Sequence, residues 1–189
     1  MNKWTLPASL KVGGADFEIR TDFRIVLGIF KWLKKDDLPE AARFSIVLKA
    51  LYVDVDKIRQ EDIDEALAKA FEFMAGGRDE VADDDTHKPQ LVDWEKDADI
   101  IIPAINKVAG YDVRGQKLHW WTFLSMYSEI GEGTFATVVG IRNKMAHGKK
   151  LDDFEKEFLR ENKAMVVIQT EETKRQMEED RAALAEIGL

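Results

Sequence analysis

Residues 93–124 read DWEKDADIIIPAINKVAGYDVRGQKLHWWTFL, and this stretch decides the fold that the sequence predicts. It carries three of the five tryptophans in the chain, Trp94, Trp120 and Trp121. Isoleucines recur at helical spacing in its first half, and a turn at Gly110 separates them from the aromatic second half. The stretch therefore predicts two helices packed antiparallel at the centre of an all-helical core.

A short β-hairpin is predicted ahead of the helices, within residues 1–20. Gly13 and Gly14 suit a two-residue turn, because glycine tolerates the positive φ that such turns require. This turn sets Leu10 opposite Phe17 and places the apolar residues of both strands on one face. A lone hairpin is marginally stable in water, so we expect that face to pack on helices.

Further helices are predicted on both sides of the central stretch, because apolar residues recur there with helical periodicity. The expected segments are 21–35, 39–51, 61–75, 134–147 and 152–162. Phe71 and Phe154 are among the side chains that we expect to face inward. The predicted fold class is mainly α: a multi-helix single domain over residues 1–168 with a short N-terminal β-hairpin.

The C-terminal residues 169–189 form a polar segment of high helix propensity. Between residues 170 and 183, Met177 is nearly the only large apolar side chain. A helix there has no apolar stripe to bury against its own domain. We expect a polar C-terminal helical arm, which is either held by a partner or frayed.

The chain of 189 residues has a net charge of −8, and one stretch nearly accounts for it. Residues 79–99 hold nine acidic residues and two lysines, a balance of −7. Residues 78–92 lack periodicity, so we expect them to form a mobile acidic loop. The acidic balance argues against nucleic-acid binding, which needs clustered lysine and arginine. No apolar run is long enough to cross a bilayer, so no membrane partner is expected.

The acidic residues that open the central stretch, Asp93, Glu95 and Asp97, alternate like the start of a calcium loop. Such a loop would need glycine where Ala98 stands and glutamate where Ala104 stands. We therefore interpret the three carboxylates as a solvated helix start. The chain has no cysteine, and its three histidines show no ligand spacing. The sequence predicts no metal and no cofactor.

The segment RNKMAHG at residues 142–148 resembles the RNxxxH signature of the HEPN ribonucleases. The resemblance implies that Arg142 stabilises charge on the RNA backbone and that His147 handles the proton. Histidine titrates near neutral pH and arginine binds phosphate oxygens bidentately, so the chemistry is sound. The other interpretation is the basic end of a helix, where cations suit the negative end of the helix dipole.

A broader resemblance rests on four segments: DWEKDAD at 93–99, LHWWTF at 118–123, GIR at 140–142 and GKKLDDFEKEFLREN at 148–162. Together they resemble the bacteriophage gene-product-fifteen family, tail-module proteins of phages of Gram-positive hosts. The resemblance covers residues 93–167, and the start at 10–32 is also similar. His147 is not part of the family pattern, which lowers the weight of the ribonuclease interpretation.

The resemblance implies a gene in the morphogenesis block of long-tailed phages, between the major tail protein and the tape measure. It implies a non-enzymatic tail assembly chaperone that coats the tape-measure protein in the host cytoplasm during assembly. The partners expected are the tape-measure protein, the major tail protein or both, with self-association as a further expectation. The alternative is a structural component of the virion, in its neck or tail.

The tryptophan pair Trp120 and Trp121 has two interpretations. It stacks a base or a sugar, or it packs in the core; the helical spacing and the acidic surroundings favour the core. A helical tape measure would need an apolar groove between helices, rimmed by charge. We place that groove near Trp94, Trp120 and Trp121, because the aromatic density of the chain is highest there.

Overall fold

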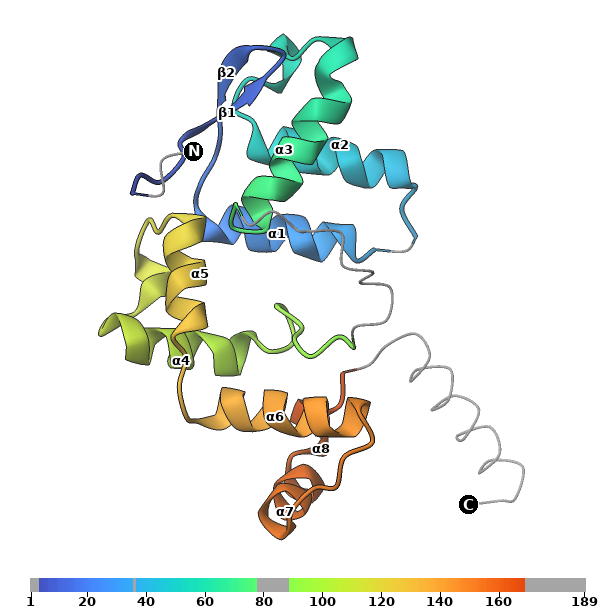
Figure 1. Cartoon of the computed structure of the whole chain (residues 1–189), viewed down its shortest axis with the longest axis vertical. Coiled ribbons are helices and arrows are strands. Elements are labelled where there is room, and N and C mark those ends of the chain that lie inside the picture. The colour runs from blue at the N-terminus through green and yellow to red at the C-terminus, as the bar shows by residue number, and fades with distance from the viewer. Residues whose placement is uncertain (1–3, 36, 78–88, 169–189) are drawn as a thin grey trace, which may run out of the picture. The chain divides into compact units, whose positions relative to one another are not determined.

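A computed structural model gives the fold and describes residues 4–35, 37–77 and 89–168. The described chain is mainly α-helical, with a two-stranded antiparallel sheet near its start (Figure 1). The predicted fold class is thereby confirmed. The polar arm at 169–189 and residues 78–88 of the acidic loop lie outside the described residues, and what was expected of them stays a prediction.

The contacts of the chain divide it into two compact units. The first unit comprises residues 1–87 and 99–130, and the second comprises residues 88–98 and 131–189. The division falls inside the predicted domain, whose boundary with the C-terminal tail stays a prediction. Within the described residues, no helix combines the length and the apolar character that crossing a membrane requires.

The predicted hairpin is present in the predicted register. β1 (Ser9–Val12) pairs antiparallel with β2 (Ala15–Glu18), and Leu10 lies opposite Phe17. The two turn glycines have φ of +56° and +83°, a region that glycine enters without steric cost. The apolar residues of β1 are buried, and β1 packs on α3 (Ile63–Met74). The hairpin is therefore supported by a helix, as expected.

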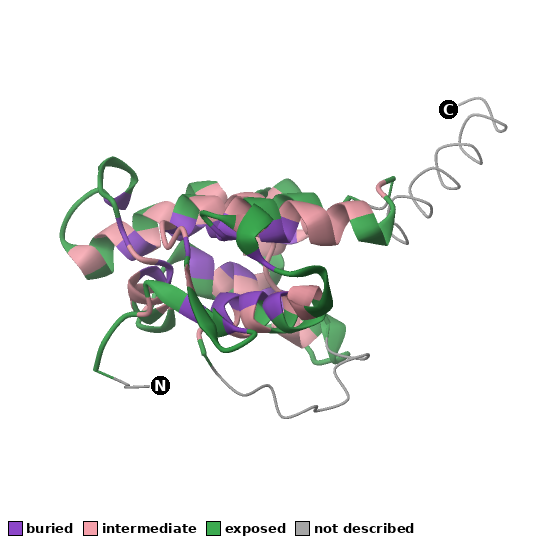
Figure 2. Cartoon of the chain, turned by 90° about the horizontal axis from the view of Figure 1, so that it is seen from above, coloured by how far each residue is buried: buried purple, intermediate pink, exposed green. Residues whose placement is uncertain are grey.

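Three helices of the first unit follow one another in space as in sequence. α1 (Phe23–Leu33) packs on α2 (Glu40–Leu51), and α2 packs on α3. The side chain of Asp22 caps α1. The 3-10 turns η1 (Val55–Lys57) and η2 (Gln60–Asp62) connect α2 to α3. Figure 2 shows buried positions recurring between exposed ones along the helices, as amphipathic packing requires.

The prediction that Phe71 faces inward is wrong. Phe71 is 38% exposed, whereas Phe73 is 1% exposed. The ring of Phe73 stacks against Trp121, with 5.9 Å between ring centroids. The helical period alone allows a stripe on either side of α3, and the position of the tryptophan decides between them.

The central stretch forms α4 (Ala98–Ala109) and α5 (Trp120–Ser128), with the 3-10 turn η4 (Val113–Gly115) between them. The predicted antiparallel pair is not observed. α4 and α5 run in different directions, and α5 packs against α1, crossing it steeply in Figure 1. A backbone bridge between Asp22 and His119 joins the residues that precede α1 and α5. This bridge sets the start of α5 beside the start of α1.

The core of the first unit is aromatic, as the sequence predicts. The rings of Phe23 and Phe123 stack with 4.5 Å between centroids, and Trp120 stacks on Phe123 at 5.7 Å. All three side chains are buried. Stacked rings of this kind remove a large apolar area from water and fix the helices that carry them.

The second unit contains α6 (Thr134–Ala146), α7 (Asp153–Glu161) and α8 (Lys163–Val166). α6 packs against both of the others, and a capping box begins α7. Phe154, expected to face inward, is 66% exposed. It lies in the first turn of α7, where its ring centroid lies 6.2 Å from that of Phe158 one turn further along the helix.

Candidate partner-binding site

Two adjacent tryptophans at the start of α5 hold the end of α3. The indole N–H of Trp120 donates to the carbonyl oxygen of Met74 at 2.9 Å. The indole N–H of Trp121 donates to the carbonyl oxygen of Phe73 at 2.8 Å. The last carbonyls of a helix have no partner four residues further along the same helix. The indoles supply donors to these two carbonyls, although that of Phe73 also accepts from the N–H of Gly76 at 3.0 Å. The two indole bonds anchor α5 to α3.

The glycines that end α3 leave room for one of these rings. Gly76 and Gly77 have φ of +81° and +68°, which ends the helix as glycine commonly does. A Cβ atom on Gly77 would lie 2.5 Å from the Cη2 atom of Trp121, closer than van der Waals contact allows. Trp121 is therefore packed against the backbone of Gly77 on one side and the ring of Phe73 on another.

His119 caps α5 with its side chain. Its Nδ1 accepts from the backbone N–H of Trp121 at 3.0 Å, and its Nε2 lies 3.0 Å from the carbonyl oxygen of Pro7. With Nδ1 as an acceptor, the other ring nitrogen, Nε2, is assigned as the donor to Pro7. Within the three described ranges, no group of three or more metal-binding side chains is arranged to hold an ion.

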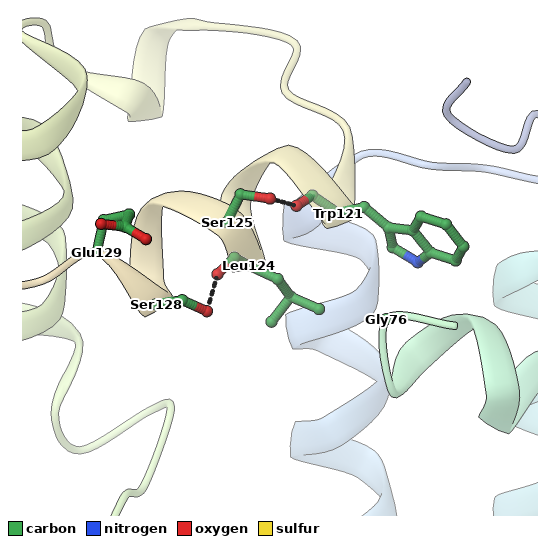
Figure 3. Close-up of a pocket in the computed structure, with 6 residues that line it drawn as sticks. All are labelled: Gly76, Trp121, Leu124, Ser125, Ser128 and Glu129. Carbon is green, nitrogen blue, oxygen red and sulfur yellow. Dashed lines mark hydrogen bonds between the residues drawn. The ribbon is translucent and has the colours of Figure 1, made fainter. Parts of the chain in front are cut away.

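A shallow groove opens beside this joint, between the end of α3 and the exposed flank of α5 (Figure 3). It has a volume of about 310 Å³. The residues that line it are Gly76, Trp121, Leu124, Ser125, Ser128 and Glu129. We call it the α3–α5 groove.

The α3–α5 groove combines an apolar base with a polar rim. Trp121 and Leu124 point toward the end of α3, and Glu129 lies farther along α5 (Figure 3). Ser125 Oγ donates to the carbonyl oxygen of Trp121 at 2.8 Å, and Ser128 Oγ donates to that of Leu124 at 2.9 Å. The hydroxyl hydrogens are thus used within the helix, and their oxygens remain as acceptors. The groove suits an apolar side chain flanked by a hydrogen-bond donor or a positive charge.

The three tryptophans predicted to bind a partner have different positions. Trp120 is 1% exposed, so its side chain is part of the core. Trp121 lines the α3–α5 groove. Trp94 is half-buried and belongs to the second unit, whereas the other two belong to the first. Within the first unit, the structure brings Trp120 and Trp121 together, and of these two Trp121 lines the surface groove.

Sequence reasoning missed the residues on the exposed flank of α5. Ser125, Ser128 and Glu129 lie at helical spacing from Trp121, which places all four on one side of α5. The spacing of these residues could have indicated the groove from the sequence. The hydrophobic pattern did not, because that pattern identifies the buried face of a helix and not its exposed flank.

The other charged site of interest is a buried ion pair in the second unit. Arg142 Nη1 lies 2.6 Å from Asp97 Oδ2, and Arg142 Nη2 lies 2.8 Å from Asp97 Oδ1. Both residues are buried, with exposures of 6% and 2%. The interpretation of Asp97 as a solvated residue is therefore wrong. It lies just before α4, and its carboxylate is enclosed by a partner 45 residues away.

The guanidinium of Arg142 has no N–H left for another ligand. Besides its bonds to the carboxylate, it donates from Nε to the carbonyl oxygen of Val166 at 2.6 Å. It also donates from Nη1 to Leu91 and from Nη2 to Met165, at 2.9 and 2.8 Å. An arginine side chain has five N–H donors, and all five are used here. The exposed His147 has its Nδ1 2.8 Å from the carbonyl oxygen of Asn143.

The fold and this site define a small, mainly α-helical protein with a hairpin at its start and a groove beside an indole-capped helix end. The family model described as "Bacteriophage Gp15 protein" matches residues 3–168. The chain belongs to this family, which confirms the resemblance seen in the sequence and places it among phage structural or morphogenesis proteins. Neither a curated protein nor a solved structure matches it.

Proposed function

We propose that the protein is a non-enzymatic tail assembly chaperone that binds the tape-measure protein of its phage. The observation that carries the proposal is the family match over residues 3–168. The resemblance of the four sequence segments to this family implies a gene beside the tape-measure gene. A protein of a phage structural or morphogenesis family, encoded at that position, would be suited to hold the tape measure before the tube forms around it.

The α3–α5 groove supplies a means of binding. A tape measure is expected to be a long helical polypeptide, and helices bind other proteins through apolar side chains spaced three or four residues apart. Leu124 and the ring of Trp121 offer an apolar base for such a side chain. Ser125, Ser128 and Glu129 offer acceptors to the polar residues beside it.

The groove is also rigid, which favours affinity. Trp121 is fixed by its hydrogen bond to Phe73, by stacking on that ring and by contact with Gly77. A side chain that is already ordered loses little conformational entropy when a partner binds.

The chemistry at the RNxxxH segment favours binding over RNA cleavage. A ribonuclease of that kind needs a guanidinium that can reach the scissile phosphate. The five N–H donors of Arg142 are bonded to Asp97 and to three backbone carbonyls. Freeing them would leave a charged pair buried and incomplete, which is costly.

The proposal is tested by co-expressing the tagged protein with the tape-measure protein encoded beside it. We expect the two to co-purify. Ser128→Arg, which places a long cationic side chain in the groove, should reduce the recovered tape measure roughly tenfold. Ala68→Arg is the matched control, because Ala68 is exposed on α3 and does not line the groove.

Mass spectrometry of purified virions distinguishes the chaperone from a virion component. A chaperone is released before the particle is complete, so its peptides should be absent from virions that contain the tape measure. Recovery of the protein at a constant ratio to the tail proteins would replace the proposal with a structural role. Failure of the wild-type chain to co-purify with the tape measure would contradict the proposed chaperone function.

A further inference from the structure

A second groove lies in the first unit, between the start of α1 and the residues that lead into α5. It has a volume of about 570 Å³. Its lining includes three cations, one carboxylate and two aliphatic side chains: Arg20, Arg24, Lys117, Asp22, Ile25 and Leu118. We call it the basic groove. We infer that it is the docking site for an acidic segment of a polypeptide, which on the proposed function is a segment of the tape-measure protein.

The walls of the basic groove are tied together by the backbone. The N–H of Phe23 donates to the carbonyl oxygen of Leu118 at 3.0 Å. The N–H of Trp120 donates to the carbonyl oxygen of Thr21 at 2.7 Å. These two bonds hold the segments before α1 and α5 side by side and fix the backbone that carries the groove.

The ends of two helices add to the positive potential of the basic groove. α1 and α5 both begin there, with Asp22 and His119 as their capping residues. The N-terminus of a helix carries a partial positive charge. Both caps are occupied, so the helix ends strengthen the field around the groove without being binding sites themselves.

The charges of the basic groove do not cancel. The carboxylate of Asp22 is taken up by Arg24, with distances of 2.6 and 2.8 Å to its Nη2 and Nε. The bond from Arg24 lowers the pKa of Asp22 and keeps that carboxyl ionised. Lys117 also lies close enough for its charge to favour the ionised form of Asp22. Three cations against one carboxylate leave the groove with an excess of two positive charges, those of Arg20 and Lys117 once Arg24 is paired with Asp22.

The side chains of the two remaining cations, Arg20 and Lys117, differ in how firmly they are held. Arg20 Nη1 donates to the carbonyl oxygens of Lys49, Ala50 and Tyr52, at 3.1, 3.2 and 2.5 Å, which fixes that side chain at the end of α2. Lys117 is exposed and has no hydrogen bond or ion pair within the part of the chain that the structure describes. Lys117 is therefore the cation that can move to meet a ligand.

The kind of ligand follows from the difference in charge between the basic groove and the whole chain. The protein has a net charge of −8, and the basic groove is locally positive. Opposite charges across an interface steer association and select the partner. Ile25 and Leu118 add an apolar surface, so the groove suits a carboxylate next to an apolar side chain, as in an acidic amphipathic segment. Two uncompensated cations are too few to follow a nucleic-acid backbone.

The experiment compares two charge reversals that alter the net charge by the same amount. Lys117→Glu reverses the free cation of the basic groove. Lys107→Glu reverses an exposed lysine on α4 that does not line it. Peptides that tile the tape-measure protein are labelled, and their binding to the full chain is followed by fluorescence anisotropy at low and at high salt. The full-length tape measure is tested by co-purification with the same variants.

We expect acidic tiles to bind the wild-type chain at low salt and to bind Lys117→Glu roughly tenfold more weakly. The difference should shrink at high salt, because ions screen exposed charges. Lys117→Gln should have an intermediate effect, and Lys107→Glu should bind within about twofold of the wild type. Thermal unfolding of each variant checks that the fold is retained.

The outcomes separate this inference from the proposed function. One outcome overturns the docking site but leaves the proposed chaperone function intact. In that outcome the tape measure co-purifies, but peptide binding is unchanged by Lys117→Glu or is stronger for basic peptides than for acidic ones. If the tape measure does not co-purify, both fall. If a single-stranded RNA displaces the acidic tiles as well as an acidic peptide does, the groove is a general polyanion site and the inference is wrong.

Discussion

The two compact units of the chain are held together by different chemistry. The first unit has stacked aromatic rings at its centre, among them Phe23, Phe123 and Trp120. The second unit has a buried ion pair, Asp97 with Arg142. Buried rings stabilise by removing apolar area from water. Buried charges are tolerated only where each polar group is satisfied, and the loss of one partner is costly.

The ion pair of the second unit also satisfies backbone carbonyls. In the second unit, Arg142 donates to the carbonyl oxygens of Leu91, Met165 and Val166, which come from an irregular segment and a helix of four residues. An apolar side chain at position 142 would leave these acceptors without that donor. The arginine is needed where regular structure ends.

The largest effect is expected from removing one member of the ion pair. Asp97→Ala leaves the Arg142 guanidinium buried without its counter-charge, which should lower the free energy of unfolding of the second unit by about 3–5 kcal/mol. Hydrogen exchange followed by mass spectrometry should show loss of protection in α6 while α1 stays protected. Glu157→Ala removes an exposed ion pair with Arg160 and should change the stability little.

The double variant Asp97→Leu with Arg142→Met tests why the pair is needed. It removes both charges, but it also removes the donors to the three carbonyls. We expect it to remain less stable than the wild type, although more stable than Asp97→Ala. Full protection of α6 in Asp97→Ala would show that the ion pair does not hold the second unit together.

The next effect concerns the joint between α3 and α5 in the first unit. Gly77→Ala adds a methyl group 2.5 Å from the ring of Trp121, at a φ of +68°. We expect a loss of about 2–4 kcal/mol from strain and overpacking. Gly110→Ala is the matched control, since its φ is +77° and a Cβ there meets nothing within 4 Å. It should cost only the backbone strain, about 1–2 kcal/mol, in urea unfolding. Equal losses for the two variants would contradict the close packing of Trp121.

The smallest effect is an alkaline loss of stability in the first unit. Tyr52 is buried and its hydroxyl donates to the carbonyl oxygen of Ala66 at 2.8 Å. Burial, and then the charge of Glu65, raises the pKa of Tyr52 above its ordinary value. Above pH about 10 the unfolded chain releases this proton and the folded chain retains it, so stability falls as pH rises. The slope approaches about 1.4 kcal/mol per pH unit.

Tyr52→Phe should remove this slope, although it starts from a lower stability at neutral pH because the hydrogen bond is lost. Tyr111→Phe, at an exposed tyrosine, should keep it. The measurement is the free energy of unfolding by urea between neutral pH and about pH 11. An unchanged alkaline slope in Tyr52→Phe would assign the effect to other groups.

Local chemistry was sufficient for much of the fold. The hairpin register follows from two glycines and the alternation of apolar residues around them, because a strand has a period of two. The helices are found close to the predicted segments, because their spacing of apolar residues is a property of each segment. Gly76 and Gly77 end α3 for the same kind of reason, since positive φ suits glycine. The family also follows from segments that can be read along the chain.

The remaining features of the fold depend on contacts between segments that are distant in the sequence. Asp97 meets Arg142 across 45 residues, and no spacing rule connects positions so far apart. Phe73 is buried instead of Phe71 because Trp121 arrives on its side of α3. Patterns along a sequence state which face of a segment is apolar, but not which segment will cover it. The partner of each face depends on how distant segments pack, and so do the α3–α5 groove and the basic groove.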